Sequence, residues 1–170
     1  MGELGGLAAI APSHPHMFGA QVAWSHAFGG VPVWVADERW LGRRDDVVRL
    51  WSNEQDVLPG VRLVRCGGHF PGSCVAHWRD GAGGAGSLLT GDTIGTARAA
   101  GWVTFLRSFP NLLPLSPAAV RRIVDRLDPY PYERLYALAG RPVDREAKAA
   151  VRRSAERYVG WVTGEFDADT

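Results

Sequence analysis

The chain has 170 residues, and its 19 Lys and Arg residues almost balance its 18 Asp and Glu residues, which leaves a formal net charge of +1. Hydrophobic residues make up 46% of the sequence and charged residues 22%, values close to those of soluble globular domains. This composition excludes a disordered or collagen-like chain, and the length favours a single domain.

Three observations bear on location and partners. The near-zero net charge provides no long-range field that would gather nucleic acid or an anionic membrane. No apolar run approaches the roughly 18 residues that cross a bilayer, and the start lacks the pattern of a secretory signal. Cys66 and Cys74 are too few for a disulfide framework, which fits a reducing compartment. We therefore expect a cytoplasmic protein that binds neither nucleic acid nor membrane.

The first third of the chain predicts a short strand, a helix and a second strand, at residues 7–10, 21–28 and 31–35. Pro12 and Pro15 lie between the first two elements and bias the residues before them toward extended backbone. Gly29-Gly30 provides the stop signal of the helix.

The middle third predicts three further strands, at residues 61–66, 74–78 and 87–90. The link at 81–86 matches G-x-G-x-x-G, but strand-like Leu88-Leu89 follows it. A dinucleotide site needs the N-terminus of a helix at that point, so the link is interpreted as a hairpin turn.

The last third predicts a helix, a strand at 134–137 and a second helix. Ser116-Pro117 begins the first helix, whose inner face carries Val120, Ile123, Val124 and Leu127. Asp144 is expected to cap the second helix, whose inner face would carry Ala147, Val151, Ala155, Tyr158 and Val162. Residues 164–170 are expected to form a loose acidic tail. The seven tryptophans are expected in the core and in pocket walls.

Three histidines and one aspartate stand at predicted loops in a pattern typical of a metal site. His14 and His16 are two residues apart on a segment that Pro15 would keep extended, so both rings would point the same way. His69 follows two glycines at the end of a strand, and Asp92 follows a glycine in the same manner. Neutral imidazole and carboxylate oxygen are ligand types for zinc and iron.

Other interpretations of these residues stay open. An aspartate after a glycine is most often a turn former. His26 lies in a predicted helix and His77 in a predicted strand, and both are interpreted as structural or solvent-exposed. Cys66, His69 and Cys74 would make a separate zinc knot, but that knot lacks an evident fourth ligand.

The chain resembles the metallo-β-lactamase-like hydrolases, and the later segments at 109–115 and 153–158 resemble a bacterial subgroup of that family. The resemblance rests on Ser13-His14-Pro15-His16, on Gly67-Gly68-His69-Phe70-Pro71-Gly72 and on Leu88-Leu89-Thr90-Gly91-Asp92-Thr93, in the family's order and approximate spacing. It implies one α+β domain over residues 1–163, an αββα sandwich with metal ligands on loops at one edge of the two sheets.

The chain also departs from the family pattern. The family would place an aspartate and a histidine at positions 18 and 19, where this chain has Phe18 and Gly19, and the family's last histidine is absent from residues 137–140. The resemblance therefore implies one divalent ion, zinc before iron or manganese, bound by His14, His16, His69 and Asp92. Asp92 would be the catalytic residue, either completing the coordination or accepting a proton from water.

The start of the chain is a further departure. Only about a dozen residues precede His14, whereas the family has additional strands and a helix there. We expect part of the N-terminal sheet to be lacking, with an open face and edge prone to association. A longer native product or a homo-oligomer would cover them.

Three functions follow from these features. The first is a metal-dependent hydrolase that uses a metal-activated water on a small-molecule ester, thioester, lactone, lactam or phosphoester. The second is a non-catalytic remnant of the fold that binds a metal or another ligand. The third, nucleic-acid binding by the basic last helix, is disfavoured because Asp144, Glu146 and Glu156 are interleaved with its basic residues.

Overall fold

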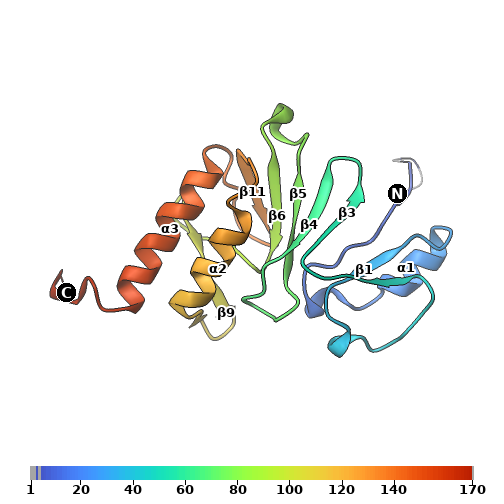
Figure 1. Ribbon diagram of the computed structural model, residues 1–170, viewed down its shortest axis with the longest axis horizontal. Helices are drawn as coiled ribbons and strands as arrows, with labels where there is room; N and C mark the ends of the chain where they lie inside the picture. The colour runs from blue at the N-terminus through green and yellow to red at the C-terminus, as the bar shows by residue number, and fades with distance from the viewer. Residues whose placement is uncertain (1–2, 4, 170) are drawn as a thin grey trace.

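The computed structural model describes residues 3 and 5–169 and shows an elongated molecule built around a five-stranded sheet (Figure 1). The α-helices are α1 (Gln21–Ala27), α2 (Pro117–Leu127) and α3 (Ala147–Val162). The strands of the central sheet are β3 (Glu54–Leu58), β4 (Val61–Arg65), β5 (Cys74–Trp78), β6 (Ser87–Gly91) and β11 (Arg134–Ala137). The remaining strands pair two by two: β1 (Val33–Val35) with β2 (Val48–Leu50), β7 (Gly95–Thr96) with β8 (Val103–Thr104), and β9 (Leu106–Ser108) with β10 (Leu113–Pro114).

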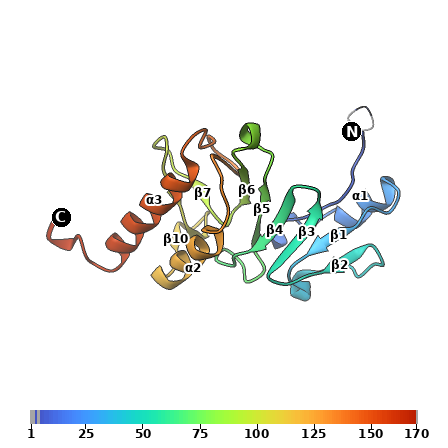
Figure 2. The same ribbon diagram turned by 45° about the horizontal axis from the view of Figure 1, so that its top comes forward.

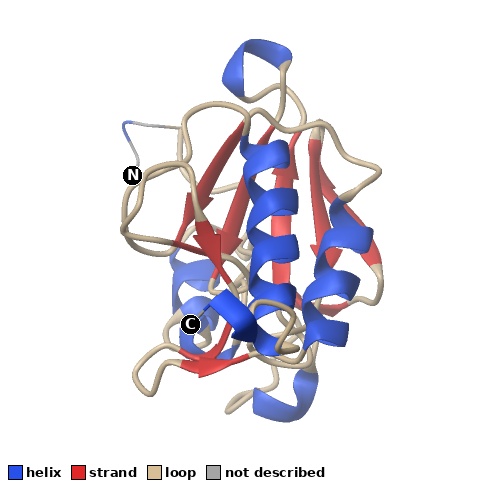
Figure 3. Ribbon diagram, turned by 90° about the vertical axis from the view of Figure 1, so that its left-hand side faces the viewer, coloured by secondary structure: helices blue, strands red, loops and turns tan. Residues whose placement is uncertain are grey.

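The central sheet has the order β11-β6-β5-β4-β3, with β11 parallel to β6 and the other neighbours antiparallel. One face of the sheet packs against α2 and α3, which lie in front of the strands in Figure 3. Val64, Val75, Leu88 and Leu135 point into this interface, where they meet helix residues such as Ile123, Leu127 and Val151. This interface is the main core of the molecule.

The opposite face of the sheet is covered by β1 and β2, and α1 packs on the outside of β1 (Figure 2). Trp34 and Ala36, in and just after β1, pack against Leu63 of the central sheet, while Val33 and Val35 point outward to Val22 of α1. The layers therefore run helix, sheet, sheet, helix, which is the αββα order that the family resemblance implies.

The second sheet covers only part of this face. Leu63, Ala76, Leu89 and Tyr136 form one row across β4, β5, β6 and β11. Leu63 is buried, whereas Leu89 is 47% exposed and Tyr136 36% exposed. In the described residues, the β6–β11 end of the row therefore faces outward without a covering layer.

Most of the strongly patterned elements are confirmed. The helix predicted at 21–28 is α1, which ends before Gly29 and Gly30, both with positive φ. The strands predicted at 61–66, 74–78, 87–90 and 134–137 are β4, β5, β6 and β11. The hydroxyl of Ser116 accepts a hydrogen bond from the Ala119 amide at 3.3 Å and so caps α2. The glycine link at 81–86 is a turn that holds the short 3₁₀ helix η4 (Ala82–Gly84) between β5 and β6.

Three expectations about elements are wrong. Residues 7–10 form no strand beyond one bridge between Ile10 and Val33, and Pro12 has no amide to extend that ladder. Asp144 does not cap α3, because Glu146 stands at the N-cap and donates its amide to the Glu133 carboxylate at 2.9 Å. Val162 lies exposed in the last turn of α3 rather than on its inner face.

The tryptophans also differ from expectation. Trp51 is buried, but Trp24, Trp40, Trp78 and Trp161 are exposed. In the segment expected to form a loose tail, the Phe166 ring lies 5.3 Å from that of Trp161, and the Glu165 amide donates to the Gly160 carbonyl at 2.9 Å. The tail residues up to 169 include the 3₁₀ helix η5 (Asp167–Asp169).

Among the described residues, we find no helix with the length and apolarity to cross a membrane.

The two cysteines give a first prediction. Cys66 and Cys74 are free and buried, and burial raises the pKa of each thiol to about 12. Only the thiolate attacks disulfide reagents, so we expect the folded protein to react with dithiobis-nitrobenzoate at pH 8 far more slowly than the denatured protein, in which both thiols react. Because the folded pKa values are raised, the folded state should lose stability as the pH rises above about 9. Rapid reaction of both thiols in the native protein would contradict this arrangement.

Candidate metal centre

His14 and His16 meet through a tight turn rather than through an extended segment. The backbone of His14 is extended, with φ −166° and ψ 169°, but Pro15 begins the 3₁₀ helix η2 (Pro15–Met17). A proline is well suited to the first position of a helix because its φ is already fixed near the helical value. The two rings still lie together, with centroids 5.0 Å apart. The predicted extended geometry is therefore wrong, whereas the predicted proximity of the rings is confirmed.

Glycines bring the other two side chains to the same place. Gly68, which has a φ of +87°, precedes His69, and a Cβ there would lie 2.9 Å from Ile123 Cδ1. Gly91, which has a φ of +53°, precedes Asp92, and a Cβ there would lie 2.3 Å from Ser13 Oγ. Only a residue without a side chain lets the His69 loop lie on α2 and lets the His14 segment lie against the end of β6.

The four predicted ligands converge on one point. One ligand atom from each of His14, His16, His69 and Asp92 lies within 4.8 Å of all the others. Asp92 Oδ2 is 3.4 Å from His14 Nε2 and 3.7 Å from His69 Nε2. His14 and His69 are almost fully buried, Asp92 is partly buried and His16 is exposed. The cluster thus has a buried side and an open side.

Hydrogen bonds on the outer ring nitrogens orient the two buried histidines. Ser13 Oγ is 2.9 Å from His14 Nδ1, and the carbonyl oxygen of Leu106 is 3.4 Å from His69 Nδ1. The tautomer that donates Nδ1–H to these oxygens leaves Nε2 with a free lone pair. Fixing the ring through the second nitrogen is the usual way in which proteins prepare a histidine for a metal.

The inner ring nitrogens provide the test of whether these residues fit a metal ion. The Nε2 atoms of His14 and His69 are buried and have no hydrogen-bond partner. A buried polar atom without a partner costs about 1–3 kcal/mol. A cation held between them and Asp92 would satisfy both atoms, so the donor set fits a divalent metal.

The protonation states of the buried histidines agree with this assignment. Burial lowers the pKa of His14 from 6.5 to about 4; the neighbouring His69 and His16 lower it further, and Asp92 opposes the shift. Burial also lowers the pKa of His69. Both imidazoles are therefore neutral at neutral pH, which is the form that binds a metal.

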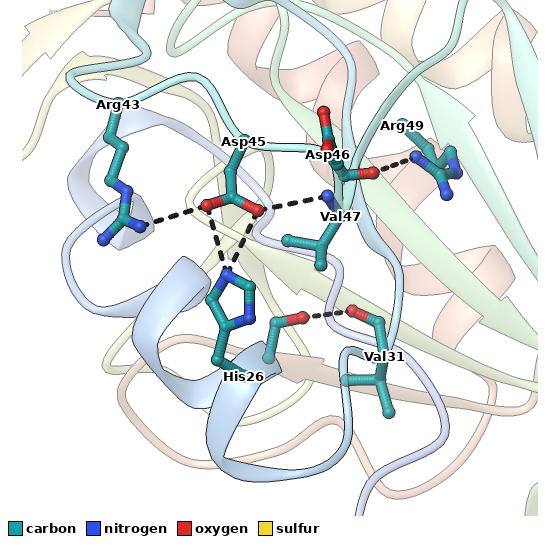
Figure 4. A network of polar contacts seen from close by, with 8 residues as sticks. His26, Val31, Arg43, Asp45, Asp46, Val47 and Arg49 are labelled. Atoms are coloured by element: carbon teal, nitrogen blue, oxygen red, sulfur yellow. Dashed lines mark hydrogen bonds and ion pairs between the residues drawn. The ribbon is translucent and has the colours of Figure 1, made fainter.

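The remaining histidines and the cysteines lie elsewhere. His26 Nε2 contacts both carboxylate oxygens of Asp45 at 3.1 Å, and Asp45 also accepts from Arg43 and from the Val47 amide (Figure 4). His77 Nε2 donates to the Pro131 carbonyl at 2.8 Å. Both histidines lie outside the ligand cluster and make polar contacts of their own, as expected of structural or solvent-exposed residues.

The zinc knot of Cys66, His69 and Cys74 is not formed, because His69 turns to the other cluster. Within residues 3 and 5–169, the set of His14, His16, His69 and Asp92 is the only group of three or more potential ligands. Phe18, at the family's aspartate position, packs near Val22 and Val33 in the core under α1. Phe18 therefore adds no ligand atom to the cluster.

Sequence reasoning missed the residues around the ligands. Ser13 stands out in the sequence only as part of a motif, and the carbonyl of Leu106 comes from a strand 37 residues beyond His69. Phe70 and Phe109 place their rings 5.0 and 5.6 Å from that of His69. Phe70 directly follows His69 in the Gly-Gly-His-Phe motif, so the sequence could have indicated an aromatic ring beside His69. The Leu106 carbonyl is a backbone group, and no sequence pattern indicates its contact with His69.

Comparison with known proteins gives one relative by sequence and many by structure. No protein-family profile matches the chain. An uncharacterised protein of Bacillus subtilis strain 168, YmaE, is 41% identical over 167 residues, which are 96% of this chain and 61% of that protein. The chain thus spans about three fifths of the length of this curated relative.

The solved structures that are similar share the fold at low identity. A di-iron-bound form of TTHA1623 aligns with a TM-score of 0.57 at 21% identity, over 85% of this chain and 75% of that one. The metallo-β-lactamase family protein TTHA1429 from Thermus thermophilus aligns with a TM-score of 0.56 at 14% identity, over 95% and 62%. An N-acyl homoserine lactone hydrolase, solved with product at its catalytic metal centre, aligns with a TM-score of 0.50 at 18% identity, over 78% and 56%.

Proposed function

We propose that this chain, which has the metallo-β-lactamase-like fold, is a metal-dependent hydrolase whose divalent ion is held by His14, His16, His69 and Asp92. The observation that carries the proposal is the pair of buried, unpartnered Nε2 atoms that face one carboxylate. Neutral imidazole with one carboxylate favours zinc, and iron and manganese accept the same ligands.

The residues of the site have separate tasks in this proposal. When bound, a dication supplies Lewis-acid polarisation of a substrate oxygen and lowers the pKa of water to about 7. His14 and His69 are held in place from behind by Ser13 and the Leu106 carbonyl. Asp92 Oδ2 lies against both rings, where its carboxylate can take a proton from water.

An apolar groove beside the four proposed ligands, none of which lines it, supports a small-molecule substrate with an apolar part. A groove of about 480 Å³ runs over the open end of the central sheet, lined by apolar side chains that include Met17, Leu89, Tyr136 and Leu138. Ser13 and Gly91, which adjoin His14 and Asp92, also line it. We propose an ester, thioester, lactone, lactam or phosphoester as the substrate. Among these, a lactone is supported by the similar fold of the N-acyl homoserine lactone hydrolase.

The substitution Asp92→Asn tests the proposal directly. The amide retains the shape of the carboxylate but cannot accept the proton, so we expect turnover to fall by about 10²–10⁴-fold. The measurement is hydrolysis of a panel of these five bond types by metal-loaded protein, with zinc, iron and manganese counted by mass spectrometry. Asp56→Asn, which loses only a surface ion pair with Arg62, is the matched control. Turnover that survives complete metal removal would refute the proposal.

A second candidate is a metal-binding protein without hydrolytic activity. It is favoured by the single ligand cluster of the described residues and by Phe18 and Gly19, which provide no second set of ligands. In that case the protein retains a stoichiometric metal ion that His69→Ala removes, yet no member of the panel is hydrolysed. The same preparation thus separates the two functions.

A further inference from the structure

Four arginines gather around a cavity on the outer side of the loop that carries His69. The cavity has a volume of about 500 Å³ and lies between the end of β4, β9 and α2. Arg65, Arg107, Arg122 and Arg126 line it, together with the backbone of Gly67 and Gly68. None of the four proposed metal ligands lines this cavity, and its lining carries arginines where the groove beside Ser13 and Gly91 is apolar.

Acidic groups balance little of the positive charge of the cavity. The cavity has no carboxylate in its lining. Within the described ranges, Arg107, Arg122 and Arg126 form no ion pair, and Arg65 reaches Asp37 only at 4.0 Å. Asp37 itself is engaged by Arg39. The chain as a whole has a net charge of only +1, so these four guanidinium groups create a local positive potential that attracts an anion.

Two of the guanidinium groups are held in place before any ligand binds. Arg107 Nη1 donates to the His69 carbonyl at 2.6 Å, and its guanidinium carbon lies 5.2 Å from the centre of the Phe70 ring. Arg65 Nε donates to the Pro71 carbonyl at 3.3 Å. A group that is fixed in advance loses less entropy when it binds a ligand.

The other two guanidinium groups come from one face of α2. Arg122 and Arg126 are one helical turn apart, a spacing at which like charges repel. Arg122 Nη2 lies over Gly67, 3.6 Å from the place where a Cβ would stand. An anion in the cavity would relieve the repulsion on the helix and would meet arginines from three elements at once.

We propose that this cavity binds the phosphate group of a small molecule. Arginine presents paired N–H donors that match the oxygens of a phosphate, and a dianion suits four cations better than a single carboxylate. The volume lies within the range of small-molecule sites. The inference does not rest on the proposed hydrolase, because phosphate binding here needs no metal.

The test is calorimetric titration of the metal-chelated full chain with inorganic phosphate and with pyrophosphate at low salt. Chelation removes any metal that phosphate would otherwise bind. We expect binding by the unaltered protein and an affinity about 100-fold lower in the double variant Arg122→Gln/Arg126→Gln. Arg121→Gln, an exposed position on the same helix, should retain the affinity of the unaltered protein. Thermal unfolding, followed by circular dichroism, checks that each variant folds.

Three results would overturn the proposal. The first is that the unaltered protein binds neither phosphate nor pyrophosphate at millimolar concentration. The second is equal affinity in the double variant and in Arg121→Gln, which would place binding elsewhere. The third is that acetate, titrated in the same way, binds as tightly as phosphate. The metal content of the same preparations, measured before chelation, reports on the proposed hydrolase independently.

Discussion

His69→Ala is expected to lower the affinity for zinc by at least about 100-fold, since changes in the groups behind a ligand already cost 10–100-fold. His69 provides one of the two buried nitrogens that face Asp92, and no other described side chain is placed to replace it. The variant should therefore be purified with almost no metal and should lack the proposed hydrolytic turnover. Metal analysis and competition with a chromogenic chelator measure the affinity.

His77→Ala is the matched control for this variant. His77 is also a buried histidine on the central sheet, but its ring donates to the Pro131 carbonyl and lies outside the ligand cluster. We expect its metal content to equal that of the unaltered protein, although its stability falls by about 1–3 kcal/mol. Equal metal content in the unaltered protein, His69→Ala and His77→Ala would show that His69 is not a metal ligand.

Phe105→Ala is expected to destabilise the fold by about 3–5 kcal/mol, the usual cost of deleting a buried phenylalanine. Phe105 is completely buried between the sheet and the helices, and its ring meets that of Tyr158 of α3 at 5.8 Å. Because typical domains have only about 5–15 kcal/mol of stability, the loss should be plain in chemical denaturation. The next residue, Leu106, supplies the carbonyl behind His69, so the metal affinity should also fall.

Val162→Ala provides the comparison for Phe105→Ala. The helical pattern of the sequence puts Val162 on the inner face of α3, but the structure exposes it in the last turn. A change at this position should alter the free energy of unfolding by no more than about 0.5 kcal/mol. A large loss at Val162, or none at Phe105, would show that the packing differs from that described.

The sequence predicts the elements that carry a strong and local pattern. α2 follows from Ser116-Pro117 and from apolar residues at helical spacing, and β5 and β11 follow from short apolar runs between turns. β3 has no apolar alternation that would predict a strand, because three polar residues at 54–56 are followed by two adjacent apolar ones, Val57 and Leu58. β7, β8 and β10 have two residues each, too few for any periodicity. Tertiary contacts alone select these strands.

The sequence indicates which four side chains gather at the candidate site, but it does not indicate the backbone conformation that brings them together. Glycine and proline neighbours mark His14, His69 and Asp92 as residues at sharp turns, and the structure brings them together with His16. The 3₁₀ turn at Pro15 was not foreseen, because a proline is compatible both with extended backbone and with the first position of a helix. Gly91 has a positive φ, as expected of a glycine that frees the backbone, and it also makes room for Ser13.

The four ligands stand on three distant stretches of chain: the turn at 14–16, the loop after β4 and the end of β6. A cation shared by all of them would act as a cross-link that holds the turn at 14–16 against the central sheet and closes long loops, much as a disulfide bond does. Since such an ion binds the native chain and not the unfolded one, the melting temperature should rise with the concentration of free metal. The ion would then stabilise the native fold in addition to taking part in the chemistry.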